Sequence, residues 1–288
     1  MRAALIALAL LSCENGAMAV DLDALWNFGD PAASEARFRA ALTDASADDA
    51  LILQTQIART WGLRGDFDRA RAILAGVEPQ LAHAGAQVRV RYALELGRSY
   101  SSAAHPESTQ TPQVKELARV QYRQAYETAR AQGMDGLAID ALHMMAFVDT
   151  APADQLRWDQ QALAIALAST QPGAKKWEAS LRNNLGYALH DLGRLDEAQA
   201  QFAQALGLRE RGADALAIRI ARWMVAWNLR ALGRVDEALQ MQLQLEREWD
   251  AAAAPSPYVY EELELLYRAK GDEVQAARYA QRKAALAK

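Results

Sequence analysis

The sequence predicts an all-α protein built from repeated helical hairpins. Within residues 182–208, apolar side chains recur at spacings of three and four residues, which place them on one face of an α-helix. The two stripes consist of Leu185, Gly186 and Leu189, and of Ala198, Phe202 and Ala205. Gly193 lies between the stripes, where the end of a helix often takes a positive φ. The composition agrees, because alanine, leucine and arginine dominate and all three favour helices.

A fixed period supports the hairpin interpretation. Gly193 is followed by Gly233 after 40 residues and by Gly271 after a further 38 residues. Similar apolar stripes flank each of these glycines. Self-similarity at this spacing is typical of hairpins that stack and bury a shared core.

The chain is expected to begin with a helical cap over residues 20–48. Asp30 is suited to cap a helix, and Pro31 would occupy the first helical position, where its missing N–H costs nothing. Phe38 and its apolar neighbours would then cover the open end of the stack. Terminal repeats need such a cover because one hairpin cannot bury its own apolar face.

The remaining copies follow in chain order. One surrounds Gly65, and the next begins near Leu96 and carries a polar insert, residues 101–113, between its helices. We expect this insert to be mobile, and either to fold over one edge of the groove or to be tolerated slack without a role. A degenerate copy spans residues 143–167, where His143 is expected to pack inside the hairpin. With the three copies described above, the total is about six.

The placement of small residues around these turns resembles the tetratricopeptide repeat (TPR) family. The segments NNLGYAL and ALGLRER are similar to the longer repeats of kinesin light chains. The resemblance implies a bacterial protein with a right-handed α-solenoid of about six TPR-like helical hairpins, the superhelix covering residues 49–288. It also implies a non-enzymatic scaffold that binds a protein or peptide partner in its concave groove.

In this family the first helix of each hairpin lines the groove. Transferring that geometry gives a set of candidate partner-binding residues: Gln56, Arg59, Arg91, Arg98, Asn183, Asn184, Tyr187, His190, Trp223, Trp227 and Arg230. Asn184 occupies the position where peptide-binding members carry an asparagine that clamps the ligand's main chain. An amide suits this role because it both donates and accepts hydrogen bonds.

Structural roles compete with ligand binding at several of these positions. The adjacent amides of Asn183 and Asn184 have poor helix propensity, so they either join neighbouring hairpins or bind a ligand. Trp223 and Trp227 are four residues apart and could pack against the next hairpin. The arginines could form a solvated, charged face.

Composition and motifs argue against other function classes. A net charge of −4 disfavours nonspecific binding of nucleic acid. The sequence has no Gly-rich phosphate loop, nucleophile elbow or His-Glu-x-x-His motif. Its four histidines lack the spacing of metal ligands. We therefore expect no catalytic residues, no cofactor and no bound metal, and no stretch reaches the roughly 20 apolar residues of an integral membrane segment.

Residues 1–19 have several interpretations. Arg2, a short apolar core and the motif Ala17-Met18-Ala19 outline an export signal. Cys13 follows a sequence resembling a lipobox, which would make the protein a lipoprotein. Alternatively, the true start lies at Val20. The protein would be periplasmic under the export reading and cytoplasmic under the last one.

Two alternative functions follow from the same features. Some bacterial TPR arrays tighten around a signal peptide and act as peptide-responsive regulators, although those usually carry an additional effector domain. The other alternative is a structural subunit of an envelope complex, which an export signal would favour.

Overall fold

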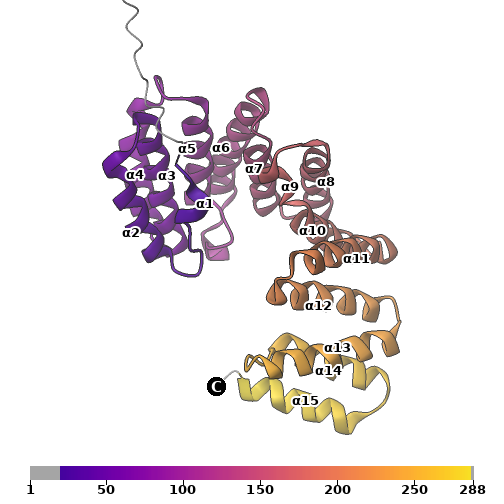
Figure 1. Cartoon of the computed structure of the whole chain (residues 1–288). Helices are drawn as coiled ribbons and strands as arrows, with labels where there is room; N and C mark the ends of the chain where they lie inside the picture. Colours follow the sequence, from indigo (N-terminus) through magenta and orange to yellow (C-terminus); the bar gives the residue numbers. More distant parts are fainter. Residues whose placement is uncertain (1–19, 287–288) are drawn as a thin grey trace, which may run out of the picture.

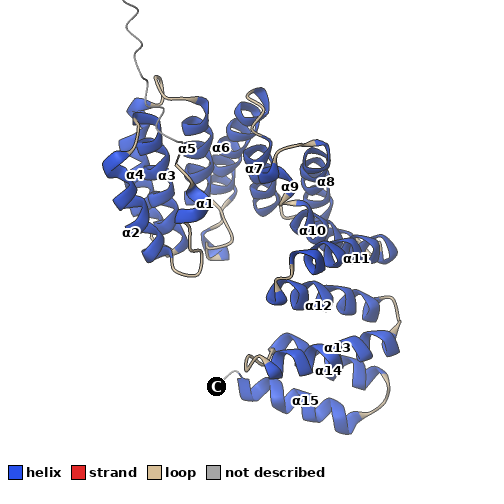
Figure 2. Ribbon diagram, viewed as in Figure 1, coloured by secondary structure: helices blue, strands red, loops and turns tan. Residues whose placement is uncertain are grey.

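The computed structural model describes residues 20–286, and across this range the chain is helical without strands. The helices are α1 (Leu22–Leu25), α2 (Pro31–Ala41), α3 (Ala47–Leu63), α4 (Phe67–Val77), α5 (Ala86–Tyr100), α6 (Pro112–Ala131), α7 (Asp135–Val148), α8 (Pro152–Ala168), α9 (Pro172–Lys175), α10 (Glu178–Asp191), α11 (Leu195–Gly212), α12 (Ala215–Ala231), α13 (Val235–Ala251), α14 (Pro257–Ala269) and α15 (Glu273–Leu286). Short loops connect them, as Figure 2 shows. The predicted all-α fold is confirmed.

The helices form hairpins that stack in chain order. The pairs α3–α4, α5–α6, α7–α8, α10–α11, α12–α13 and α14–α15 pack against each other, and each pair contacts the next. Figure 1 shows them following a curved path. The short helix α9 interrupts this order and packs against α7 and α8. The expected six hairpins are therefore present, with a small irregularity between the third and the fourth.

Tight turns and close helix contacts build each hairpin. Gly193 has a φ of 72°, a conformation that a side chain disfavours, and the following N–H donates to the carbonyl of Leu189 at 2.9 Å. Where α10 crosses α11, a Cβ added at Gly186 would lie 2.5 Å from the ring of Phe202. Gly186 therefore lets the two helices approach closely. Gly97 and Tyr122 repeat the same contact between α5 and α6, also at 2.5 Å.

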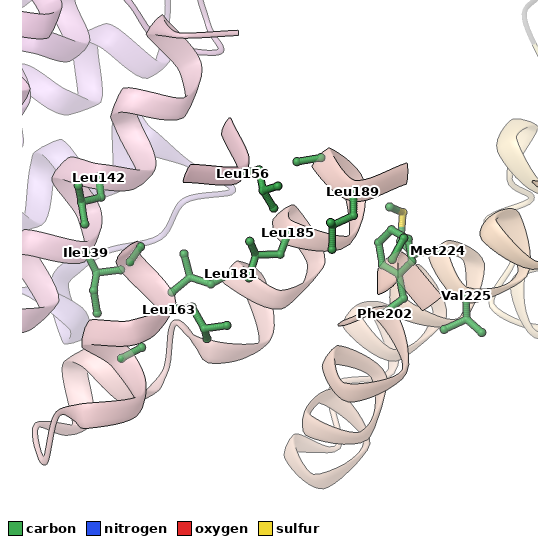
Figure 3. Close-up of a cluster of buried hydrophobic side chains, with 14 of the residues drawn as sticks. Ile139, Leu142, Leu156, Leu163, Leu181, Leu185, Leu189, Phe202, Met224 and Val225 are labelled. Carbon is green, nitrogen blue, oxygen red and sulfur yellow. The ribbon is translucent and has the colours of Figure 1, made fainter. Parts of the chain in front are cut away.

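The hydrophobic core is not a single sphere. It consists of several clusters that follow one another along the stack, and each cluster spans neighbouring hairpins. One cluster extends from α7 to α14 and includes Leu142, Leu185, Phe202 and Met224, several of which Figure 3 shows in a row along the hairpins. Other clusters lie under α1–α5, under α5–α8 and at the C-terminal end. Each hairpin buries its apolar stripe against its neighbours, as stacked repeats require.

Helices α1 and α2 pack against the N-terminal end of the stack. The Asp30 side chain accepts a hydrogen bond from the backbone N–H of Ala33, and Pro31 begins α2. Phe38 is fully buried against the first hairpin. The expected export signal, with Cys13, lies outside the described residues. Within residues 20–286, none of the helices has the length and apolar character needed to cross a membrane.

The polar insert 101–113 is held in place, unlike the mobile loop expected from its composition. The ring of His105 stacks on Phe67 with 3.6 Å between centroids. The side chain of Gln110 accepts a hydrogen bond from Ser101 at 2.6 Å and donates to the carbonyl of Tyr100 at 3.2 Å. These contacts fix the insert against α4 and α5.

Candidate partner-binding groove

Side chains of consecutive first helices meet in a row along the stack. We call this row the first-helix strip; it consists of the polar and aromatic side chains of α3, α5, α7, α10, α12 and α14 that meet between neighbouring hairpins. Its bridging contacts are Arg59–Glu95 (3.7 Å), Arg98–Asp140 (2.5 Å), Asn184–His143 (3.3 Å), His190–Asn228 (2.8 Å) and Arg230–Glu262 (2.8 Å). The strip therefore joins all six hairpins, and most of the residues predicted from sequence belong to it.

The strip begins with a network of charges on α3, α5 and α7. Arg98 donates to Glu95 at 2.6 Å and to Asp140 at 2.5 Å, and Arg59 lies near the same Glu95. Burial opposes ionisation, but the charges of Asp140 and Glu95 raise the pKa of Arg98. Burial outweighs the carboxylates at Arg59 and Arg91, and lowers the pKa of both guanidiniums. Arg59 and Arg98 thus serve mainly to pair with Glu95 and Asp140, whereas Arg91 forms no ion pair within residues 20–286 and its Nε has no hydrogen-bond partner there.

The first predicted groove residue, Gln56, is not available to a partner. Its side chain is 1% exposed and accepts a hydrogen bond from the indole N–H of Trp26 at 3.1 Å. The Arg59 guanidinium lies 5.5 Å from the centre of the Trp26 ring and 5.4 Å from that of Phe28. The N-terminal cap therefore covers this end of the strip.

The strip ends with stacked aromatic rings on α10, α12 and α14. Trp227 stacks on His190 and Tyr187, with ring centroids 3.5 Å and 5.1 Å apart. Trp223 stacks on Trp227 at 5.9 Å and meets the edge of Tyr258 at 6.2 Å. We call Tyr187, Trp223, Trp227 and Tyr258 the aromatic patch. Tyr187 is 45% exposed and Tyr258 66% exposed, so the patch combines neighbour packing with accessible ring surface.

The indole N–H of Trp223 has no hydrogen-bond partner within residues 20–286. Arg230 follows on α12 and forms a two-pronged ion pair with Glu262 of α14, with both distances 2.8 Å. The side chain of Glu262 is 4% exposed. Hydrogen bonding to Glu262 raises the pKa of Arg230. This end of the strip is thus tied to the last hairpin by one ion pair.

The two asparagines expected in the groove point into different surroundings. Asn184 bonds to His143 of α7 and lines a cavity with Asp159. Asn183 lines another depression, beside Arg209 and Ile220, between α10, α11 and α12. Hairpin-to-hairpin bonding thus accounts for part of the Asn184 role, and Asn183 lies off the first-helix strip.

Several residues of the strip were missed by sequence reasoning. His143 was expected in a hairpin core, and this expectation was wrong: its ring contacts Asn184, Phe147 and Trp177 and lines the same cavity as Asn184. The others are Asp140, Asn228 and Tyr258, and Asp159 of α8 was missed beside the strip. The sequence does show these side chains as polar residues of first helices or, for Asp159, of the next helix. Their partners could not be predicted, because they depend on the angle between stacked hairpins.

The chain's likeness to known proteins agrees with this geometry. Residues 177–247, from the start of α10 into α13, match the family described as tetratricopeptide repeat. No match to a curated protein was found. Within residues 20–286, no group of three or more His, Cys, Asp or Glu side chains is arranged to hold a metal ion.

Solved structures with similar folds include repeat proteins of two kinds. The apo form of RapI has a TM-score of 0.66 and 11% identity, over 87% of this chain and 69% of RapI. A Rap protein complexed with Competence and Sporulation Factor has a TM-score of 0.56 and 15% identity, over 91% and 74% of the two chains. A putative kinesin light chain of Podosopora anserina with nearly identical TPR-like repeats has a TM-score of 0.55 and 16% identity, over 73% and 99%. These identities support a shared fold alone. Residues 177–247 therefore match tetratricopeptide repeats, and most of the chain shares the helical-repeat fold of these structures.

Proposed function

We propose that the protein is a non-enzymatic scaffold that binds a protein or peptide along the first-helix strip. The aromatic patch carries this proposal. Its rings come from three consecutive hairpins and retain exposed surface at Tyr187 and Tyr258. Exposed apolar clusters on folded proteins mark interaction sites, and tryptophan and tyrosine are enriched among the residues that dominate binding energy.

The rest of the strip supports an extended ligand. The N-terminal part offers charged groups on α3, α5 and α7, and the C-terminal part offers aromatic faces. An extended chain lying across several hairpins would contact both. In this proposal the aromatic patch anchors apolar side chains of the partner, and Asn184 fixes its polar groups.

A peptide-responsive regulator is a second form of the same proposal. The observation that favours it is the similar Rap protein, which was solved in complex with Competence and Sporulation Factor. In that form, the ligand would bridge the two halves of the strip and change the curvature of the stack.

Site-specific photo-cross-linking tests the proposal. A photoreactive phenylalanine analogue replaces Tyr187 or Tyr258 in the full chain, which is expressed in its source organism. The matched control places the same analogue at Val120 of α6, a second helix, where the side chain is 47% exposed. We expect a discrete adduct from the two patch positions that disappears when Trp227→Ala is added. Adducts from Val120 alone would move the interface to the second helices.

A further inference from the structure

A small cavity lies beside the strip where the third and fourth hairpins meet. It has a volume of about 160 Å³ and is lined by side chains of α7, α8 and α10, which are His143, Ala146, Phe147, Gln155, Asp159, Asn184, Tyr187 and Ala188. Because Asn184 and Tyr187 also belong to the first-helix strip, the cavity opens from the surface proposed above to bind a partner.

One of the lining residues, Asp159, is a buried acid without a counterion among residues 20–286. Asp159 is 2% exposed, and its Oδ1 has no hydrogen-bond partner among residues 20–286. No Lys or Arg of the described chain lies within ion-pair distance of it. Burial raises the pKa of Asp159 to about 7, against the opposing effect of a hydrogen bond from the Asn184 amide. A buried acid without a counterion costs free energy that a bound cation would recover.

The other walls do not supply that cation. Burial lowers the pKa of His143, so its imidazole is neutral at physiological pH. The nearest guanidinium on α5, that of Arg98, is already engaged by Glu95 and Asp140. Gln155 donates its amide to the carbonyl of Ala146 at 3.1 Å. The cavity therefore contains one acidic group and no positive one among the described residues.

The shape of the site favours one kind of cation. Oδ1 of Asp159 is buried without a hydrogen-bond partner within residues 20–286. An ammonium can bind through this single acceptor, whereas a guanidinium characteristically makes two parallel bonds to a carboxylate. Phe147 and Tyr187 line the same cavity and are 38% and 45% exposed. Aromatic faces attract an ammonium group that passes beside them.

We propose that this cavity binds a primary ammonium group of the ligand, with Asp159 as its counterion. The proposal rests on the proposed function in that the group belongs to the partner bound along the strip. A lysine side chain and a free N-terminus share this chemistry.

Titration with n-butylammonium chloride tests the proposal in the full chain. The side-chain amide resonance of ¹⁵N-labelled Asn184 reports on the cavity. We expect a saturable shift with n-butylammonium and none with n-butanol, which has the same chain length without the charge. Asp159→Asn should weaken binding at least tenfold. The matched control, Asp154→Asn, changes an exposed acid on the same helix and should leave binding unchanged.

A second variant keeps the test informative if Asp159→Asn perturbs the fold. Phe147→Leu alters only the exposed wall, and should weaken n-butylammonium binding about two- to fivefold. Equal responses to n-butanol, absence of any saturable shift, or unchanged binding in both variants would overturn the proposal.

Two further probes identify the source of the ammonium. Acetyl-Gly-Lys-Gly-amide offers a lysine and a blocked N-terminus, and Gly-Gly-Gly-amide offers an N-terminus without lysine. Binding of either one through Asp159 supports the proposal and names the source. The outcome is independent of the cross-linking experiment: cross-links at Tyr187 without ammonium binding would refute the cavity alone, and ammonium binding without those cross-links would refute the groove alone.

Discussion

The two halves of the first-helix strip use the same backbone for different chemistry. On α3, α5 and α7 the strip is charged, and Arg59 and Arg98 pair with Glu95 and Asp140 of the neighbouring helices. On α10, α12 and α14 it is largely aromatic and retains exposed ring surface. In the first half the charged groups pair mainly with one another, although Arg59 Nε, Arg91 Nε and Glu95 Oε2 have no hydrogen-bond partner within residues 20–286. The second half keeps exposed ring surface. The repeat thus determines the position of each side chain in the strip, but not whether that side chain contributes to stability or to binding.

The largest expected effect on stability comes from a substitution in the charged half of the strip. Glu95 is 4% exposed and contacts two arginines, so Glu95→Gln would leave buried positive charge with fewer partners. We expect a loss of about 3–5 kcal/mol in the free energy of unfolding. In the matched variant Glu262→Gln, the partner Arg230 has a 29% exposed side chain and can be hydrated, so the loss should be about 1 kcal/mol. Equal losses in urea titrations would contradict the contrast between the halves.

A pH-dependent effect on stability is expected at Asp159, where the third and fourth hairpins meet. The folded-state pKa of Asp159 is about 7, above the unfolded value near 4, so the folded protein holds a proton that the unfolded chain has lost between these values. The associated stability is fully present below about pH 4 and disappears as the pH rises through about 7. Because asparagine does not titrate, the variant Asp159→Asn lacks this pH-dependent contribution to stability.

The stability of Asp159→Asn relative to wild type should therefore rise with pH, by up to ~4 kcal/mol between pH 4 and pH 8. The titratable groups that line the cavity beside it, His143 and Tyr187, are present in both proteins and cancel in the comparison. Urea titrations at several pH values measure it. A difference that does not change with pH would show that Asp159 titrates normally.

A third prediction concerns the close glycine–ring contact between two helices, which occurs in both halves of the strip. Gly97→Leu in the charged half and Gly186→Leu in the aromatic half would each drive a side chain into the ring of Tyr122 or Phe202. We expect each to cost about 1–3 kcal/mol or more through overpacking. Gly76→Leu in α4 is the control, because a side chain there meets open space. Thermal melting distinguishes them, and an unchanged melting temperature for Gly186→Leu would refute the close contact of α10 with α11.

The smallest effect on stability is expected in the aromatic patch. Tyr187 is 45% exposed, so Tyr187→Ala should reduce the free energy of unfolding by about 1 kcal/mol or less. Since Tyr187 stacks on Trp227, the tryptophan fluorescence should change although the fold is kept. Partner cross-linking from Tyr258 should weaken at the same time. A large loss of stability with unaltered cross-linking would assign the patch to packing.

The sequence alone determined the local structure of this protein. The helical spacings around Leu185 and Phe202, the turn at Gly193 and the cap at Asp30 depend on neighbouring residues, and the structure confirms each of them. The number of hairpins followed from the period. These features are predictable because apolar periodicity and turn chemistry act over a few residues.

Only the tertiary structure decided which side chains of the groove meet. Asn184 contacts His143 across 41 residues, and His190 contacts Asn228 across 38. Such pairs depend on the angle between stacked hairpins and on α9, which lies between the third and fourth. The same geometry buries Gln56 under the cap, turns Asn183 away from the strip and brings Asp159 into a cavity. Periodicity specifies the face on which a residue stands, whereas packing between repeats determines what it faces.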